Sequence, residues 1–515
     1  MLFNKIYASN PRLVDKQVKP FSRVFIFAIV MLYVFYGFFN RDPWKNEDVI
    51  GFASILKLIN TPFLNWNSTI SLLPWNENGT AYYLFSAFIS KIFIFLSVRV
   101  DHAVRIGAIL LVLTTIYCIW KSVFILCLNR NFAPYEYPLG GQPEKDKYAK
   151  CMADISVLLF CGCIGAILRI HETTPFILGM CINSFVCYII VDNLKRNYHK
   201  HLKLAFNILC FLILIYANYN SSYLNNPNGF SFQTVLERLN VMVVQYPTFT
   251  WPLVPFAIFA FLCWYNQSIM QKLMLINLIA ILVFIFDSKL HQGYFLYALP
   301  SLCILASLAF AKMPTNIHKI IIGFNIILFS FLLFSLWIIW VCWQNNIYLI
   351  KYLYYVNHDI TLSAIIFATC ATLLWFSTLY IYRNIVLEPP IWLSPYLMAS
   401  GLTISWVVIV HLWLPAVNQI KTYRYVFNTI NLYVNDSCVS VHDLQAPQMA
   451  SLSYMAKFKV GNNCKFTLSY MPYTKNLLEI TPPNNSVLVW QGRRLLDKDE
   501  SFYLWKSVED KNTPL

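Results

Sequence analysis

The sequence FIFAIVMLYVFYGFFN (residues 25–40) is followed directly by RDPWKNED (residues 41–48). The first stretch has no charged residue, as expected of a helix in lipid. The second stretch is polar and contains two adjacent carboxylates, Glu47 and Asp48. The pattern therefore predicts a membrane helix that emerges into water near residue 40, with an acidic pair beside the membrane surface.

The acidic pair has two interpretations. Asp and Glu in the first turn of a helix complement the helix macrodipole, and Pro43 just upstream fits a helix start. Alternatively, the pair acts as a general base or a cation site that faces a cleft at the membrane surface. The two roles are compatible, because a carboxylate at a helix start can also face a substrate.

The composition excludes a soluble protein. Hydrophobic residues make up 58% of the chain and charged residues only 12%, whereas ordinary globular proteins contain roughly 25% charged residues. The apolar runs recur at the length needed to cross a bilayer as helices, which is roughly 17–25 residues. Backbone groups in lipid must be paired internally, so the sequence predicts an α-helical polytopic membrane protein.

The chain is basic, with 39 Lys and Arg against 24 Asp and Glu and a net charge of +15. In a membrane protein this excess collects in the cytoplasmic loops. The sequence has no basic arm with interleaved aromatic residues, so we expect no nucleic-acid partner. Membrane lipids and an anionic lipid or phosphate substrate are compatible with the charge.

Basic residues before residue 24 place the start of the first helix in the cytoplasm and its end, with the acidic pair, outside. Residues 81–98 are also apolar, but a span there would move most later basic loops outside. We therefore expect 81–98 to lie along the surface or to re-enter. About eleven spans result, with the C-terminus outside: 24–40, 104–126, 152–170, 174–192, 204–218, 250–265, 273–287, 292–311, 320–343, 361–382 and 393–415.

The composition changes near residue 417, where charged residues and Asn return. The runs CVSV (438–441) and SVLVW (486–490) predict strands, with a helix over 444–458 between them. The predicted organisation is thus a membrane domain over 1–416, with an outer loop at 41–103, and a small α/β domain over 417–515. Cys438 and Cys464 lie in this polar region and predict a disulfide if the region is outside the cytoplasm.

Two further polar segments lie on the predicted outer side, RIHETT (169–174) and DSKLH (287–291), and Tyr294 follows the second. The first is interpreted either as a polar helix end on a short loop or as part of a site, and the second either as an interfacial turn or as part of a site. A carboxylate can act as general base on an acceptor hydroxyl, and Lys or Arg can stabilise a departing lipid phosphate. Mg²⁺ or Mn²⁺ could bind adjacent carboxylates, although no complete ligand set is visible.

Three segments resemble motifs of bacterial polyprenyl-phosphate-dependent glycosyltransferases of the GT-C fold, similar to the lipid A 4-amino-4-deoxy-L-arabinose transferase family. Arg41-x-x-Trp44-x-x-Glu47-Asp48 resembles the segment after the family's first helix. Glu77 with Tyr82-Tyr83 resembles a second motif, in which Asn78 replaces a lysine and Gly79-Thr80 replaces Pro-Pro. Lys289 and Tyr294 belong to a third segment that ends at Pro300.

The resemblance implies an enzyme of about 11–13 transmembrane helices in the bacterial inner membrane, with a small C-terminal α/β domain and an active site on the periplasmic side. It implies sugar transfer from a polyprenyl-phosphate donor to lipid A, lipopolysaccharide or another periplasmic acceptor. Glu47 is the predicted base, and Asp48, Glu77 and Glu172 are predicted to assist it. The predicted substrate-binding residues are Arg41, Trp44, Tyr82, Tyr83, His171, Lys289, His291 and Tyr294.

Two other functions are compatible with the sequence. A protein O-glycosyltransferase of the same fold would use the same donor and differ only in its acceptor. A transporter or flippase for lipid-linked saccharides would be expected to show internal repeats and charged residues near the membrane midplane. No two halves of the chain resemble each other, which favours an enzyme.

Overall fold

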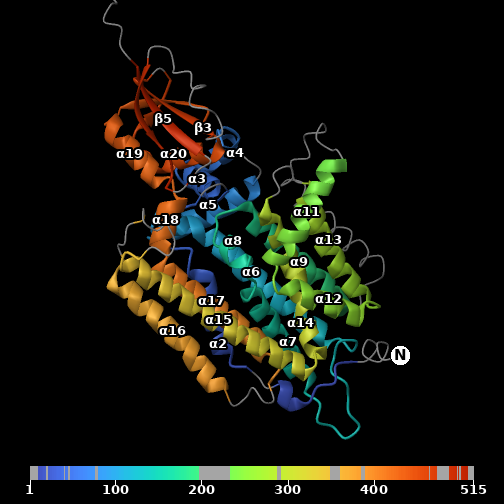
Figure 1. Ribbon diagram of the computed structural model, residues 1–515. Helices are drawn as coiled ribbons and strands as arrows, with labels where there is room; N and C mark the ends of the chain where they lie inside the picture. The colour runs from blue at the N-terminus through green and yellow to red at the C-terminus, as the bar shows by residue number, and fades with distance from the viewer. Residues whose placement is uncertain are drawn as a thin grey trace, which may run out of the picture. The chain divides into compact units, whose positions relative to one another are not determined.

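The computed structural model describes most of the chain (Figure 1). The described residues are 10–18, 21–39, 41–44, 47–75, 79–195, 232–286, 291–347, 356, 360–383, 389–435, 437–462, 464–472, 486–495, 497 and 500–507. They form two compact units. The membrane unit comprises Met1–Phe39, Ile106–Trp337 and Ser363–Val410, and the loop-and-sheet unit comprises Asn40–Arg105, Ile338–Leu362 and His411–Leu515.

The membrane unit consists mainly of helices. Those of its N-terminal half are α2 (Arg23–Phe35), α6 (Val100–Leu128), α7 (Lys145–Cys161), α8 (Ala166–Arg169) and α9 (Pro175–Lys195). Those that follow are α11 (Phe232–Phe249), α12 (Leu253–Trp264), α13 (Ser268–Phe286), α14 (Phe295–Lys312), α15 (Thr315–Gln344), α16 (Leu362–Tyr382) and α17 (Leu393–Leu412). Two short 3₁₀ helices, Asp15–Val18 and Gln292–Tyr294, complete the set described.

Helix α14 is the centre of the membrane unit. It packs against α7, α9, α12 and α13, and the apolar stretch within Gln292–Lys312 is buried along its whole length. Small residues let neighbouring backbones approach closely, and α14 is rich in Ala and Ser. The contact with α9 depends on Gly179, because a Cβ atom there would lie 2.2 Å from the ring of Tyr297.

Seven of the described helices are long and apolar enough to cross a membrane, or eight if the bent pair α11–α12 is one span. The seven are α6, α9, α13, α14, α15, α16 and α17, and each coincides with a predicted span. The predicted span 204–218 lies outside the described residues. The structure therefore confirms an α-helical polytopic membrane protein.

Three predicted spans differ from the observed helices. The first helix ends at Phe35, and Gly37 then adopts a positive φ of 103° beside the ring of Trp406. The predicted helix 152–170 stops at Cys161, where the Gly162–Gly165 turn begins and the amide of Gly165 donates to the carbonyl oxygen of Phe249. The predicted span 250–265 corresponds to α12, which has only 12 residues and meets the preceding helix α11 at 94°.

Helix α5 (Thr80–Phe95) belongs to the loop-and-sheet unit and has 16 residues. At about 1.5 Å per residue it is about 24 Å long, less than the hydrocarbon core of roughly 30 Å. One of its faces is exposed and apolar, formed by Phe88, Ile92 and Phe95. The opposite face buries Tyr82 and Tyr83. The placement expected for 81–98, along the surface or re-entrant, stays a prediction that this length and this burial suit.

The rest of the loop-and-sheet unit contains a five-stranded sheet of order β2-β1-β3-β5-β4. The strands are β1 (Cys438–His442), β2 (Lys459–Val460), β3 (Phe466–Pro472), β4 (Ser486–Gly492) and β5 (Glu500–Ser507). Strands β2, β1 and β3 are parallel, whereas β5 is antiparallel to both β3 and β4. Helices α19 (Arg424–Val434) and α20 (Ala446–Met455) pack on this sheet around one apolar core, and α18 (Leu414–Lys421) precedes them (Figure 1).

The predicted strands at 438–441 and 486–490 and the predicted helix at 444–458 correspond to β1, β4 and α20. Cys438 and Cys464, the pair indicated by the sequence, are joined by a disulfide with their Cα atoms 5.3 Å apart. The first-loop helices α3 (Glu47–Ile59) and α4 (Trp66–Ser71), with the 3₁₀ helix Phe63–Asn65, belong to the same unit as the sheet. A core that includes Val49, Trp75 and Ala450 joins α3 to α20.

Candidate functional site

The acidic pair of the first loop lies at the start of a helix. Helix α3 begins at Glu47, and both Glu47 and Asp48 are in its first turn. The interpretation as a helix start is therefore confirmed. Their environments differ, since Glu47 is half-buried whereas Asp48 is 1% exposed.

Asp48 forms a buried ion pair with Arg41. Its Oδ2 atom lies 2.6 Å from Nη2 of Arg41, and it also accepts a hydrogen bond of 3.0 Å from the backbone amide of Trp44. The guanidinium group of Arg41 stacks over the Trp44 ring at 4.3 Å. Asp48 thus holds the segment 41–44 against the start of α3.

Arg105 adds a second buried cation. It lies near the start of α6, is 3% exposed, and donates from Nη2 to the backbone carbonyl oxygen of Arg41. Its guanidinium group is 5.5 Å from the ring of Phe52. An ionisable residue inside a predicted apolar span is a functional candidate by default. That criterion would have identified Arg105, which our reading of the sequence did not single out.

Tyr82, a predicted substrate-binding residue, lies close to this cluster. Burial raises the pKa of the Tyr82 hydroxyl, and the negative charge of Asp48 raises it further. Tyr82 also contacts Tyr83, with ring centroids 5.8 Å apart. Both side chains are buried, and their helix α5 packs against α3.

The loop before α3 is also tied to the C-terminal region of the same unit. Arg424 donates two hydrogen bonds to Asp42, of 2.7 Å from Nε and 2.6 Å from Nη2. These bonds hold the pKa of Arg424 above its ordinary value. In addition, the indole N–H of Trp44 donates to Asn418 at 3.0 Å. Asp42 and Arg424 are 382 residues apart, so no local pattern indicates their pairing.

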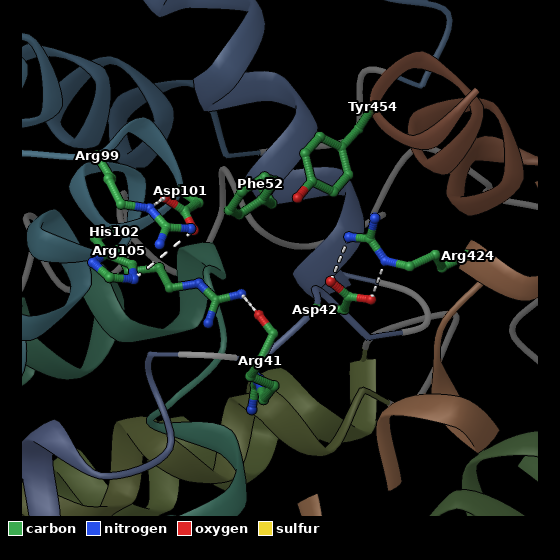
Figure 2. A pocket seen from close by; sticks show the side chains of 9 residues that line it. All are labelled: Arg41, Asp42, Phe52, Arg99, Asp101, His102, Arg105, Arg424 and Tyr454. Carbon is green, nitrogen blue, oxygen red and sulfur yellow. Dashed lines mark hydrogen bonds and ion pairs between the residues drawn. The ribbon is translucent and has the colours of Figure 1, made fainter. Parts of the chain in front are cut away.

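A cavity of about 500 Å³ lies in this unit, lined by nine residues that include Arg41, Asp42 and Arg424 (Figure 2). Five of the lining residues are basic: Arg41, Arg99, His102, Arg105 and Arg424. Two are acidic, Asp42 and Asp101, and two are aromatic, Phe52 and Tyr454. At the rim, Arg99 donates to Asp101 from Nε at 3.2 Å and from Nη2 at 2.8 Å. The cavity therefore combines a strongly cationic lining with an aromatic wall.

Other predicted site residues lie in the membrane unit. Glu172 forms an ion pair of 3.0 Å with Arg169. His171 is fully buried, with its ring nitrogens at the carbonyl oxygens of Tyr33 and Ile167 and its ring stacked on Trp406 at 5.3 Å.

His291 and Tyr294 both contact the ring of Phe176, with centroid distances of 6.0 and 4.9 Å. Two predicted site residues, Glu77 and Lys289, lie outside the described residues. Within the described part of the chain, no group of three or more His, Cys, Asp or Glu is placed to hold a metal ion. The structure therefore brings together Arg41, Trp44, Asp48 and Tyr82, and in the other unit His291 and Tyr294.

No protein-family model matches the chain, and no curated protein matches it in sequence. Similar solved structures include ArnT from Cupriavidus metallidurans bound to undecaprenyl phosphate, with 12% identity and a TM-score of 0.53 over 96% of this chain and 99% of that chain. The apo state of the same protein matches with 11% identity and a TM-score of 0.53, over 93% of this chain and 97% of that chain. The likeness shows that the chain has the fold of ArnT, which confirms the predicted GT-C architecture.

Proposed function

We propose that this protein is a membrane glycosyltransferase that moves a sugar from a polyprenyl-phosphate donor to lipid A, lipopolysaccharide or another periplasmic acceptor. The observation that carries the proposal is the cation-lined cavity of the loop-and-sheet unit, in a chain with the ArnT fold. Arg41, which lines this cavity, pairs with Asp48, the neighbour of Glu47 in the first turn of α3. The ArnT structure bound to undecaprenyl phosphate supports a polyprenyl-linked donor. We place the enzyme in the bacterial inner membrane, with Glu47 and the C-terminal region on the periplasmic side.

In the proposed reaction, an acceptor oxygen attacks the anomeric carbon of the donor sugar. A new C–O bond forms while the bond from the anomeric carbon to the phosphate oxygen breaks. Glu47 takes the proton of the acceptor hydroxyl as general base. The departing polyprenyl phosphate carries the negative charge, which guanidinium groups such as that of Arg41 stabilise. Arg41, fixed by Asp48 and Trp44, is suited to this role because it is already oriented.

The decisive test is Glu47→Gln in full-length protein reconstituted in lipid with a polyprenyl-phosphate sugar. Removing a general base lowers the rate about 100-fold or more, so we expect transfer to fall by at least that factor. Glu136→Gln is the matched control, since Glu136 forms only an exposed ion pair of 3.0 Å with Lys145. Full transfer by the Glu47→Gln variant at normal protein level would show that Glu47 is not the base.

The acceptor is identified by a separate experiment. Mass spectrometry of lipid A and envelope glycans from a deletion strain should reveal the sugar that is lost and the molecule that carried it. Loss from lipid A supports the proposed acceptor, whereas loss from envelope proteins indicates protein O-glycosylation. Purified protein that translocates a lipid-linked saccharide but transfers no sugar would be a transporter.

A further inference from the structure

The junction between α18 and α19, formed by Lys421–Arg424, is bonded on one side to the β4–β5 region of the loop-and-sheet unit. The carbonyl oxygen of Lys421 accepts a hydrogen bond of 3.2 Å from Nη1 of Arg494, and the Tyr423 hydroxyl donates one of 3.0 Å to Glu500. Arg494 and Glu500 also pair with each other, and their side chains are only 3% and 2% exposed. Salt screens a buried ion pair only weakly, so this pair holds the junction firmly on the side of the sheet.

The same junction is bonded on its other side to the first-loop segment that precedes α3. The Thr422 hydroxyl donates to Asp42 at 3.3 Å, and Arg424 donates to both carboxylate oxygens of Asp42, at 2.7 and 2.6 Å (Figure 2). Just before the junction, Asn418 of α18 accepts a hydrogen bond of 3.0 Å from the indole N–H of Trp44. The C-terminal region therefore bonds the first loop on both sides of its proline.

This first-loop segment contains Arg41, which stabilises the departing phosphate in the proposed function. The Arg41 guanidinium bonds to Asp48 and stacks over Trp44 at 4.3 Å, so its position depends on where the segment is held. The apolar core between α3 and α20 includes no residue before Val49. Apolar packing is also non-directional, whereas hydrogen bonds restrict both distance and angle. The bonds to Asp42 and Trp44 therefore supply a restraint that this core does not.

We infer that the junction positions Arg41 for sugar transfer, with Thr422 and Arg424 acting through Asp42 as positioning residues. The inference rests on the proposed function and adds to it a role for the C-terminal region that needs no contact with substrate. A displacement of about 1 Å at a reacting group can lower a rate about 100-fold. Thr422 offers the clearest test, because it is 4% exposed and does not line the cavity.

The first readout is hydrogen exchange of the full-length protein in nanodiscs, measured for Thr422→Val and Arg424→Gln. In the ordered segment the backbone amide of Trp44 donates to Asp48 at 3.0 Å. We expect this amide to exchange about tenfold faster in both variants, because the segment opens more easily when a hydrogen bond is lost. The amides that pair β3 with β5 should exchange at the wild-type rate, which separates local release from general loosening.

Each variant has a matched control. Thr429→Val makes the same change at a residue of α19 whose hydroxyl bonds only to the carbonyl oxygen of Tyr425 at 2.9 Å. Arg493→Gln removes the same charge as Arg424→Gln at an exposed residue. Neither control should alter the exchange of the Trp44 amide or the rate of transfer.

The second readout is steady-state sugar transfer. Thr422→Val should lower kcat about tenfold or more and leave the KM for the donor nearly unchanged, because it disturbs positioning rather than a substrate contact. Asp42→Ala should lower kcat as well. The double variant should have the kcat of Asp42→Ala alone, since Thr422 acts through Asp42 and its loss then has no further consequence.

The inference is overturned if either readout of Thr422→Val stays at the wild-type value, or if the losses of kcat multiply in the double variant. Arg424→Gln could disturb folding, in which case Thr422→Val decides, because valine has nearly the shape of threonine. Wild-type protein that transfers no sugar would refute the proposed function. The exchange of the Trp44 amide would then still decide whether the junction holds the segment, so the two failures are distinguishable.

Discussion

Two polar regions of this protein look alike in sequence but differ in structure. The first-loop cluster is formed by Arg41, Asp42, Asp48, Arg105 and Arg424. Arg41 pairs with Asp48 and Arg424 with Asp42, and all members except Asp48 line a cavity. In the segment 169–174 of the membrane unit, His171 instead bonds to backbone carbonyl oxygens and packs among aromatic rings. Both regions follow an apolar helix and contain adjacent His or acidic residues. Polarity at a helix end therefore does not by itself show whether the side chains line a cavity or bond to neighbouring backbone groups.

The difference between the two regions arises from the hydrogen-bond partners of their polar side chains. A buried polar group needs a hydrogen-bond partner, and backbone carbonyl oxygens supply it at His171. In the first-loop cluster the carboxylates of Asp48 and Asp42 are instead the partners of Arg41 and of the distant Arg424, and a cavity lies beside them. Mutation of each region should therefore affect stability and function differently.

The largest effect on stability is expected from Asp48→Asn. This change leaves the Arg41 guanidinium, whose side chain is 1% exposed, without its carboxylate. Breaking a buried ion pair by removing one partner costs about 3–5 kcal/mol. We expect a clear fall in the thermal unfolding temperature of the purified protein. Asp146→Asn, which disrupts only the exposed pair with Lys150, is the control and should change little. Equal effects of the two substitutions would contradict the structural role of Asp48.

A somewhat smaller loss is expected from His171→Ala. The substitution removes a fully buried ring that contacts Trp406 and Phe38, and large-to-small core changes cost about 2–5 kcal/mol. The measurement is again thermal unfolding, accompanied by the KM for the donor. An unchanged unfolding temperature with a raised KM would instead support a substrate contact by His171 and would remove the contrast between the two regions.

The smallest effect is expected from Asp42→Asn. Its partner Arg424 is 45% exposed, and exposed ion pairs contribute about 0–1 kcal/mol. Stability should therefore fall by less than about 1 kcal/mol, and the difference from wild type should shrink in high salt because the pair is screened. Chemical or thermal unfolding at two salt concentrations checks this. A loss as large as that of Asp48→Asn would show that the C-terminal region depends on this pair.

Much of the fold was predictable from residue patterns. Long apolar runs identified seven of the described helices, and the alternating runs near residues 438 and 486 identified two strands. The end of α7 before the Gly162–Gly165 turn was not predicted, because an apolar run has the same composition whether its helix is straight or broken. Likewise, Arg41, Trp44 and Asp48 were recognised as a motif, whereas Arg99 and Arg424 were not.

The sequence by itself determined that this chain is a membrane protein of helices, that an acidic pair follows the first span, and that Cys438 and Cys464 can pair. These features depend on composition and on neighbours along the chain. Only the tertiary structure decided that Asp48 is engaged by Arg41, that Arg424 reaches Asp42, and that four arginines share one cavity. The physical reason is that ion pairs and cavities depend on which distant side chains meet, and the spacing along the chain does not record that.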